Sequence, residues 1–170
     1  MNHNINQQIG VSMVEILVAI SIIAVGLLGI AGLQINALKF QKTSAQRSEA
    51  MQSAYDISER MRANALAAKA NVYLYTTAYA TTTATVPTVP TCVAPCTSAQ
   101  IAAIDQAEWL LGLSRRLLGG AGFITTNLNG GFDVTVMWKE PSYTAVDPAC
   151  ANAPSAPGAG VRCYVVTFTP

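Results

Sequence analysis

The chain has little of the chemistry on which most enzymes depend. Of its 170 residues only 11% are charged, where about a quarter is usual, and His3 is the single histidine. That histidine lies within residues 1–10, which we expect to be removed, so the mature chain could form no histidine-based triad, dyad or zinc site. No glycine-rich phosphate loop or paired-carboxylate cleft is visible. We therefore expect that the protein is not an enzyme, needs no cofactor or metal ion and has no small-molecule substrate.

Positive charge is equally scarce. The formal net charge is +1, and the basic residues form no patch. The adjacent pair Arg115-Arg116 falls on a predicted helix, where we interpret it as a solvated face. Nucleic acid is therefore not an expected partner.

A long apolar run occupies much of the first quarter of the chain. Ile16 to Leu38 contains no charged residue. At about 1.5 Å per residue, a helix of this run covers roughly the 30 Å hydrocarbon core of a membrane. We predict a short polar leader over residues 1–10, a membrane-spanning helical segment over residues 11–38 and a globular domain over residues 39–170.

A lone carboxylate stands at the head of this run. Ser12-x-x-Glu15 matches a capping box, in which side chains satisfy the free N–H groups of the first helical turn. An ionisable group that enters a membrane span is also a functional candidate whose partner must be named. If the chain is cut after Gly10, the new amino group of Val11 on a neighbouring subunit is the nearest available cation. Capping alone and capping with pairing between subunits both stay open.

Three glycines recur inside the apolar run, at Gly26, Gly29 and Gly32. Small residues on a membrane helix permit another helix to approach closely. Each glycine also weakens a helix outside lipid by up to about 1 kcal/mol. The segment could therefore pack tightly or loosen when it leaves the membrane, and the sequence alone does not separate these alternatives.

The four cysteines all follow the apolar run, at Cys92, Cys96, Cys150 and Cys163. Behind a membrane anchor, an even number predicts disulfides in an oxidising compartment. Zinc is the alternative, but structural zinc sites usually use two compact cysteine pairs. Of three possible pairings we favour Cys150 with Cys163, a loop of about 14 residues contributing roughly 3 kcal/mol, and Cys92 with Cys96 as a local clip.

Two helices are predicted. The first runs from about Ser12 to Ala70, and the second from about Ser98 to Leu118 with a capping signal at Thr97-x-x-Gln100. Helical spacing predicts a buried stripe on each. In the first helix it is Met51, Ala54, Ser58, Met61 and Ala65, and in the second it is Ala103, Ala107, Leu110, Leu113 and Leu117.

The C-terminal third has the pattern of strands. Asn129-Gly130-Gly131 predicts a hairpin turn between strands over residues 123–128 and 132–139, and a last strand is predicted from Val161 to Thr169. Phe132, Val134, Val136 and Trp138 alternate with less apolar residues, which predicts one buried face. The expected fold is α+β, a long N-terminal helix packed on a small antiparallel sheet of about three or four strands.

Gly10, Glu15 and the long apolar helix together resemble the type IV prepilins, including the pseudopilins of type II secretion. The strings Ser-Met-Val-Glu-Ile-Leu-Val-Ala-Ile and Gly-Leu-Leu-Gly-Ile-Ala-Gly-Leu-Gln are similar to minor pilins of the PilV kind. Looser similarities to that group lie at Ala107-Glu108-Trp109, residues 117–122 and residues 134–138. The N-terminal motif carries the family resemblance, and the later segments carry the subfamily.

The resemblance implies a route of processing and assembly. A prepilin peptidase and methyltransferase would cut after Gly10 and N-methylate Val11, and Glu15 would then pair with the Val11 amine of an adjacent subunit. The chain would join other minor pilins, the major pilin and a tip adhesin in a complex that initiates a type IV pilus, the fibre used in adhesion and twitching motility. It would begin in the inner membrane as a single-pass protein with a periplasmic C-terminal domain and end in the pilus fibre at the cell surface.

Two observations favour opposite sides of the membrane for the C-terminal domain. Lys39, Lys42 and Arg47 follow the apolar run, and by the positive-inside rule they would hold the C-terminal domain in the cytoplasm. The cysteines and the leader motif favour the periplasm, and we give them more weight.

Three further functions stay open. The least favoured is a thiol-active periplasmic enzyme, which would need free thiols at Cys92 or Cys96; the other two need no such thiols. One is a minor pseudopilin of a type II secretion system. The other is a membrane-tethered periplasmic binding or adhesion domain that never polymerises, for which the charge of Glu15 would be unimportant.

Overall fold

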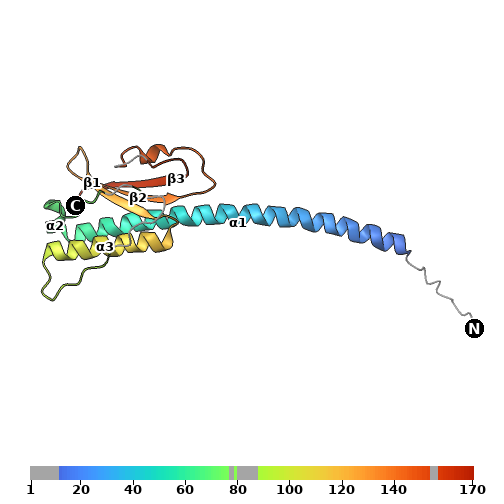
Figure 1. The fold of residues 1–170 in the computed structure, drawn as a ribbon, viewed down its shortest axis with the longest axis horizontal. Coiled ribbons are helices and arrows are strands. Elements are labelled where there is room, and N and C mark those ends of the chain that lie inside the picture. Colours follow the sequence, from blue (N-terminus) through green and yellow to red (C-terminus); the bar gives the residue numbers. More distant parts are fainter. Residues whose placement is uncertain (1–11, 77–78, 80–87, 154–156) are drawn as a thin grey trace, which may run out of the picture. The chain divides into compact units, whose positions relative to one another are not determined.

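The computed structural model describes residues 12–76, 79, 88–153 and 157–170 (Figure 1). It divides into two compact units, Met1–Lys42 and Thr43–Pro170. The predicted α+β fold is confirmed: a long N-terminal apolar helix packs through its C-terminal part on a three-stranded antiparallel sheet. In chain order the elements are α1 (Met13–Ala63), α2 (Ala65–Lys69), α3 (Ser98–Arg116), β1 (Ala121–Thr126), β2 (Phe132–Lys139), the 3-10 turn η1 (Pro148–Cys150) and β3 (Val161–Phe168).

The first helix is interrupted where continuity to Ala70 was predicted. Asn64 leaves helical geometry, with φ −111° and ψ 53°, and α2 starts after it. The Asn64 side-chain amide donates to the Ser98 carbonyl at 2.8 Å and to the Tyr73 hydroxyl at 3.2 Å. The helix therefore breaks because a side chain bonds to the start of α3, a tertiary contact that helical spacing does not reveal.

Of the stripe predicted for α1, Ala54, Ser58 and Met61 are buried as expected, and two residues are not. Met51 is 41% exposed, so its assignment to the core is wrong, and Ala65 is only half-buried. Ala50, Ser53 and Ile57, each one position before a predicted residue, are buried as well. The buried set is Ala50, Ser53, Ala54, Ile57, Ser58 and Met61.

Helix α3 begins as predicted, and Ala107, Leu113 and Leu117 of its predicted stripe are buried. Thr97 and Gln100 form both bonds of a capping box, at 2.9 Å and 3.2 Å. Ala103 is exposed rather than buried, while Trp109, absent from the predicted stripe, is 1% exposed. The Trp109 indole N–H donates to the Ser53 carbonyl of α1 at 2.9 Å, which joins the two helices.

The sheet has the order β1-β2-β3, with both pairs antiparallel. Turn chemistry positions the hairpin as predicted. The Asn127 side-chain oxygen accepts from the N–H groups of Asn129 at 3.0 Å and Gly131 at 2.9 Å, and Gly130 takes the left-handed conformation with φ 76°. Glycine at that position avoids the steric cost that a Cβ would bring.

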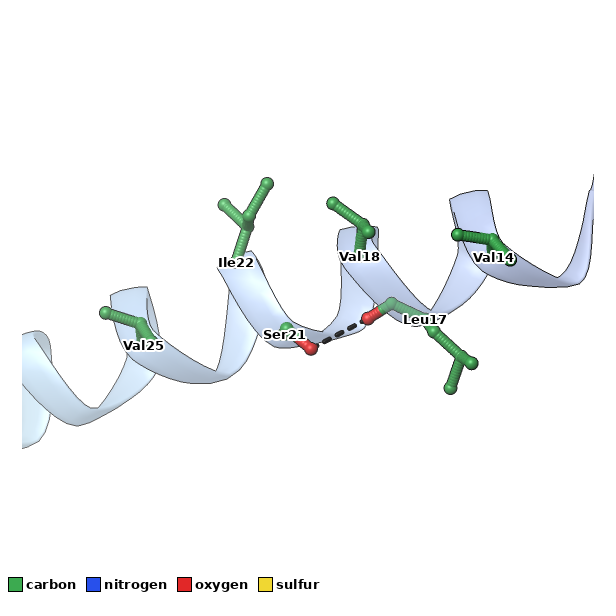
Figure 2. A pocket seen from close by; sticks show the side chains of 6 residues that line it. All are labelled: Val14, Leu17, Val18, Ser21, Ile22 and Val25. Carbon is green, nitrogen blue, oxygen red and sulfur yellow. Dashed lines mark hydrogen bonds between the residues drawn. The ribbon is translucent and has the colours of Figure 1, made fainter.

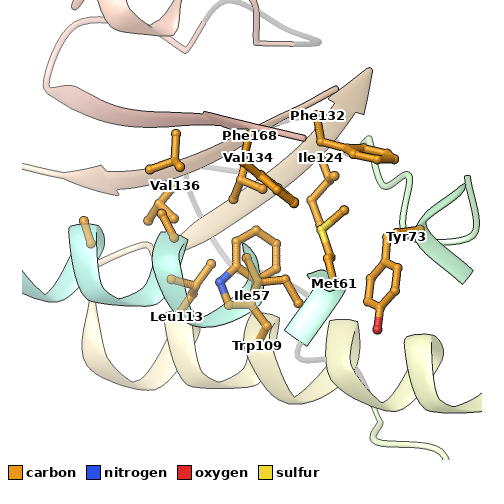
Figure 3. Packing of buried hydrophobic residues seen from close by; sticks show 14 of the residues in the cluster. Ile57, Met61, Tyr73, Trp109, Leu113, Ile124, Phe132, Val134, Val136 and Phe168 are labelled. Atoms are coloured by element: carbon orange, nitrogen blue, oxygen red, sulfur yellow. The ribbon is translucent and has the colours of Figure 1, made fainter. Parts of the chain in front are cut away.

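One face of the sheet packs on the helices (Figure 3). Ile124, Val134, Val136 and Phe168 of the strands lie over Ile57, Met61, Trp109 and Leu113 of α1 and α3 in a single buried cluster.

The opposite face of the sheet was expected to be exposed to solvent, because only one face was predicted to be buried. Half of this opposite face is in fact buried. Thr135 and Met137 are 1% and 0% exposed. The segment that contains Cys150 covers this half, and Met137 packs there with Phe123 and the cysteines. The alternating pattern did not reveal this second core because the covering segment lies outside the strands.

Candidate functional site

The surface that stands out chemically is the helix of the first unit. Its large apolar side chains are exposed, for example Leu17 at 63%, Leu28 at 73% and Leu33 at 72%. Among the described residues, α1 is the one helix long and apolar enough to cross a membrane. An apolar surface of this length needs a lipid or protein cover, because leaving it in water forfeits about 25 cal/mol for each Å².

The head of α1 holds half of the predicted capping box. The Ser12 hydroxyl oxygen accepts from the Glu15 N–H at 3.3 Å, and the Ser12 carbonyl accepts from the Glu15 and Ile16 N–H groups at 3.1 Å and 3.3 Å. The reciprocal bond to the Glu15 carboxylate is absent from the described part of the chain. That carboxylate has no ion pair or hydrogen bond with any residue that the structure describes. Gly10 and Val11 lie outside the described residues.

A shallow apolar hollow follows on the same helix (Figure 2). Its one polar group, the Ser21 hydroxyl, donates to the Leu17 carbonyl at 2.8 Å, so it is satisfied within the helix. The surface therefore presents hydrocarbon without an unpaired donor, as a lipid-facing or helix-facing surface requires. The hollow is lined by Val14, Leu17, Val18, Ser21, Ile22 and Val25.

The three glycines of the run have no packing role among the described residues. A Cβ added at Gly26, Gly29 or Gly32 would meet nothing within 4 Å. The space beside them is open, so these positions could admit a second helix at close range.

All four cysteines are joined in disulfides. Cys92 pairs with Cys96 and Cys150 with Cys163, the pairing that the sequence analysis favoured. The Sγ atoms are thereby committed to disulfide bonds, which leaves no thiolates for the alternative zinc site.

A charged cluster beside the second disulfide was missed. The Arg162 guanidinium Nε lies 3.1 Å from an Asp147 carboxylate oxygen, and the Glu140 carboxylate pairs with Arg47 of α1 at 3.3 Å. Asp147 also accepts from the Cys163 N–H at 3.1 Å. Buried carboxylates need such partners to be tolerated. Charges spaced this far apart along the chain give no sequence signal of their pairing.

A second missed network holds the helices together. Arg60 of α1 pairs with Glu108 at 2.8 Å and with Asp105 at 3.2 Å on α3, and the Tyr73 hydroxyl donates to Asp105 at 2.6 Å. The hydrogen bond to Glu108 raises the pKa of Arg60, while burial and then the bond to Asp105 raise the pKa of Tyr73. Both networks stabilise the globular unit, and neither has the open geometry of a reaction site.

Comparison with protein families gave a match to Type IV pilin Tt1218, a Tt1218-like family, over residues 32–107. The match starts inside the apolar run and ends within α3, so it covers somewhat less than half of the chain and excludes Gly10, Glu15 and the sheet. Neither the curated proteins nor the solved structures gave a match. The family match supports a type IV pilin family, whose members are structural proteins rather than enzymes.

Proposed function

We propose that this chain is a type IV pilin of the minor class that takes part in pilus assembly. The observation that carries the proposal is the exposed apolar helix headed by one carboxylate, Glu15. The family match over residues 32–107 supports it independently, because that match does not include the leader motif.

The leader and the helix define the first stage. A prepilin peptidase at the inner membrane cuts after Gly10 and methylates Val11, and the apolar helix that follows remains as a single-pass anchor. The disulfides Cys92–Cys96 and Cys150–Cys163 support a periplasmic position for the C-terminal domain, because such bonds persist in oxidising compartments.

Filament entry is the second stage. The Glu15 carboxylate pairs with the Val11 amine of an adjacent subunit while the apolar surfaces exchange lipid for protein. Gly26, Gly29 and Gly32, open in the single chain, admit the neighbouring helix. Removing one partner of a buried charge pair costs about 3–5 kcal/mol, because the other charge stays buried alone.

The minor class is the finer part of the proposal. It is supported by the similarity of the N-terminal strings and of residues 117–122 and 134–138 to minor pilins of the PilV kind. In that role the chain joins other minor pilins, the major pilin and a tip adhesin in the complex that starts the fibre.

The experiment compares Glu15→Gln with the matched variant Glu59→Gln in cells that produce the full chain. Glu59 is an exposed carboxylate whose partner is Arg62 on its own helix, so its loss leaves the helix head unchanged. Membrane fractions and sheared fibres are immunoblotted, and the mature N-terminus is sequenced. We expect N-methylated Val11 in all three proteins, equal membrane levels, and at least about a hundredfold less Glu15→Gln protein in fibres.

Three results would contradict the proposal. A mature N-terminus other than Val11 would exclude cleavage after Gly10. Equal incorporation of Glu15→Gln and wild type into fibres would exclude an essential charge pair between Glu15 and the Val11 amine. If the wild-type protein is absent from fibres, and it and both variants remain in the membrane at equal levels, the chain would instead be a tethered domain.

A further inference from the structure

A polar hollow lies on the sheet at the hairpin end, on the face away from the helices. Thr125, Asp133 and Thr167 stand opposite one another on β1, β2 and β3, so their side chains form one row across the sheet. The hollow has a volume of about 570 Å³ and is open to solvent, with room for a small ligand at the surface. The other half of this face is buried under the segment of Cys150, so the row begins where that cover ends.

The carboxylate at the centre is held rigidly. One Asp133 oxygen accepts from the Thr167 hydroxyl at 2.8 Å and from the Asn127 amide at 3.3 Å. The Asn127 oxygen is itself fixed by two turn N–H groups, so its amide nitrogen must face Asp133. The second Asp133 oxygen has no hydrogen-bond partner in the described ranges. A fixed acceptor of this kind binds a donor with little loss of side-chain entropy.

The walls limit what can bind. They come from the hairpin, with Thr126, Leu128 and Asn129, and from Asn152, which follows the disulfide-bonded Cys150. No basic or aromatic side chain lines the hollow in the part of the chain that the structure describes. The single charge is negative, which disfavours phosphate and other anions. One carboxylate is also too few for a calcium site, which usually takes 6–8 oxygens including several carboxylates.

We propose that this hollow binds a neutral sugar residue of a glycan. Sugar hydroxyls donate as well as accept, so one can donate to the open Asp133 oxygen while others bond to the Asn152 amide and the threonine hydroxyls. The Leu128 side chain, which is fully exposed on the hairpin, offers an apolar contact for the C–H face of the ring. This inference is independent of the proposed role in pilus assembly.

The test uses the full chain in a detergent without sugar head groups, since such head groups would compete. Methyl glycosides of glucose, galactose, mannose and N-acetylglucosamine are titrated by saturation-transfer NMR, with inorganic phosphate and calcium chloride as separate probes. Asp133→Asn keeps the shape of the carboxylate but not its charge. Asn152→Ala removes a wall residue without touching the Asp133 bonds. Thr144→Val, beyond the far end of β2, is the matched control.

We expect saturable millimolar binding of at least one glycoside, unchanged in Thr144→Val. Asp133→Asn should weaken it about tenfold or more, because a charged hydrogen-bond acceptor is lost, and Asn152→Ala should weaken it severalfold. Circular dichroism identifies any variant that fails to fold, and Asn152→Ala then decides the outcome. The proposal is overturned if no glycoside binds, if only phosphate or calcium binds, or if folded Asp133→Asn and Asn152→Ala both bind like wild type.

Discussion

Replacing Gly122 with alanine is expected to destabilise the globular unit, although it adds only one methyl group. Gly122 of β1 faces the Trp109 indole of α3. A Cβ at this position would lie 2.9 Å from both Cζ2 and Cζ3 of that ring and closer still to Cη2. The ring has no room to retreat, because it is 1% exposed and its N–H is bonded to the Ser53 carbonyl at 2.9 Å.

The magnitude follows from two opposing effects. Inserting a methyl group into a packed core costs about 1–3 kcal/mol. Replacing glycine by alanine also restricts the unfolded chain, which offsets about 0.4–1 kcal/mol. The difference is about 0–2.6 kcal/mol, and because the ring cannot retreat we expect the free energy of unfolding to fall by an amount in the upper half of this range. Urea titration of the full chain in detergent micelles, followed by tryptophan fluorescence, measures this change.

Two comparisons make the test specific. At Gly158 a Cβ meets nothing within 4 Å, so Gly158→Ala should change stability by no more than about 0.5 kcal/mol. In a Trp109→Phe background the outer indole ring is gone, so Gly122→Ala should cost less than it does beside tryptophan. The reasoning is refuted if Gly122→Ala is as stable as wild type, or if its cost is the same in both backgrounds.

Three further predictions concern the same unit. Replacing Cys150 and Cys163 together with alanine should lower the free energy of unfolding by roughly 3 kcal/mol, measured by urea titration against wild type. Leu113→Ala, at a fully buried position, should cost about 2–5 kcal/mol in the same assay, and a smaller loss would mean that the core relaxes around it. Burial and the bond to Asp105 raise the pKa of Tyr73, so above about pH 10 the unfolded chain loses a proton that the folded chain keeps. Stability should therefore fall as pH rises past that value, and Tyr73→Phe should reduce the slope between about pH 9 and pH 11.

Local chemistry was predictable from the sequence. The Thr97–Gln100 capping box and the Asn129-Gly130-Gly131 turn each depend on residues within five positions, and both lie where they were predicted. The α+β fold follows from such signals together with the long apolar run. The apolar run and Glu15 are likewise visible without a structure, because their meaning depends on composition rather than on contacts.

Long-range packing was not predictable in the same way. Met51 and Ala50 are adjacent, and only the packing of α1 in the folded unit decides which of them is buried. Trp109 belongs to the core because Gly122, on another element, leaves room for its ring.

The polar hollow was missed for a similar reason. The hollow can be recognised only when the strand register is known, because the register places Thr125, Asp133 and Thr167 in one row. It also depends on where the segment containing Cys150 stops covering the sheet. Each of these residues alone is an ordinary polar residue of a strand.

Each outer edge of the sheet is bonded at one residue from within the chain. On β1, Tyr75 exchanges two backbone hydrogen bonds with Ile124, at 3.1 Å and 2.8 Å. On β3, the Asp147 carboxylate accepts a hydrogen bond from the Cys163 N–H. That N–H would otherwise be available to a strand of another molecule. Uncovered edges invite copies of a protein to join strand to strand. In the fibre proposed above, these contacts would disfavour strand-to-strand joining at those two points, and lateral association would fall to the apolar helix.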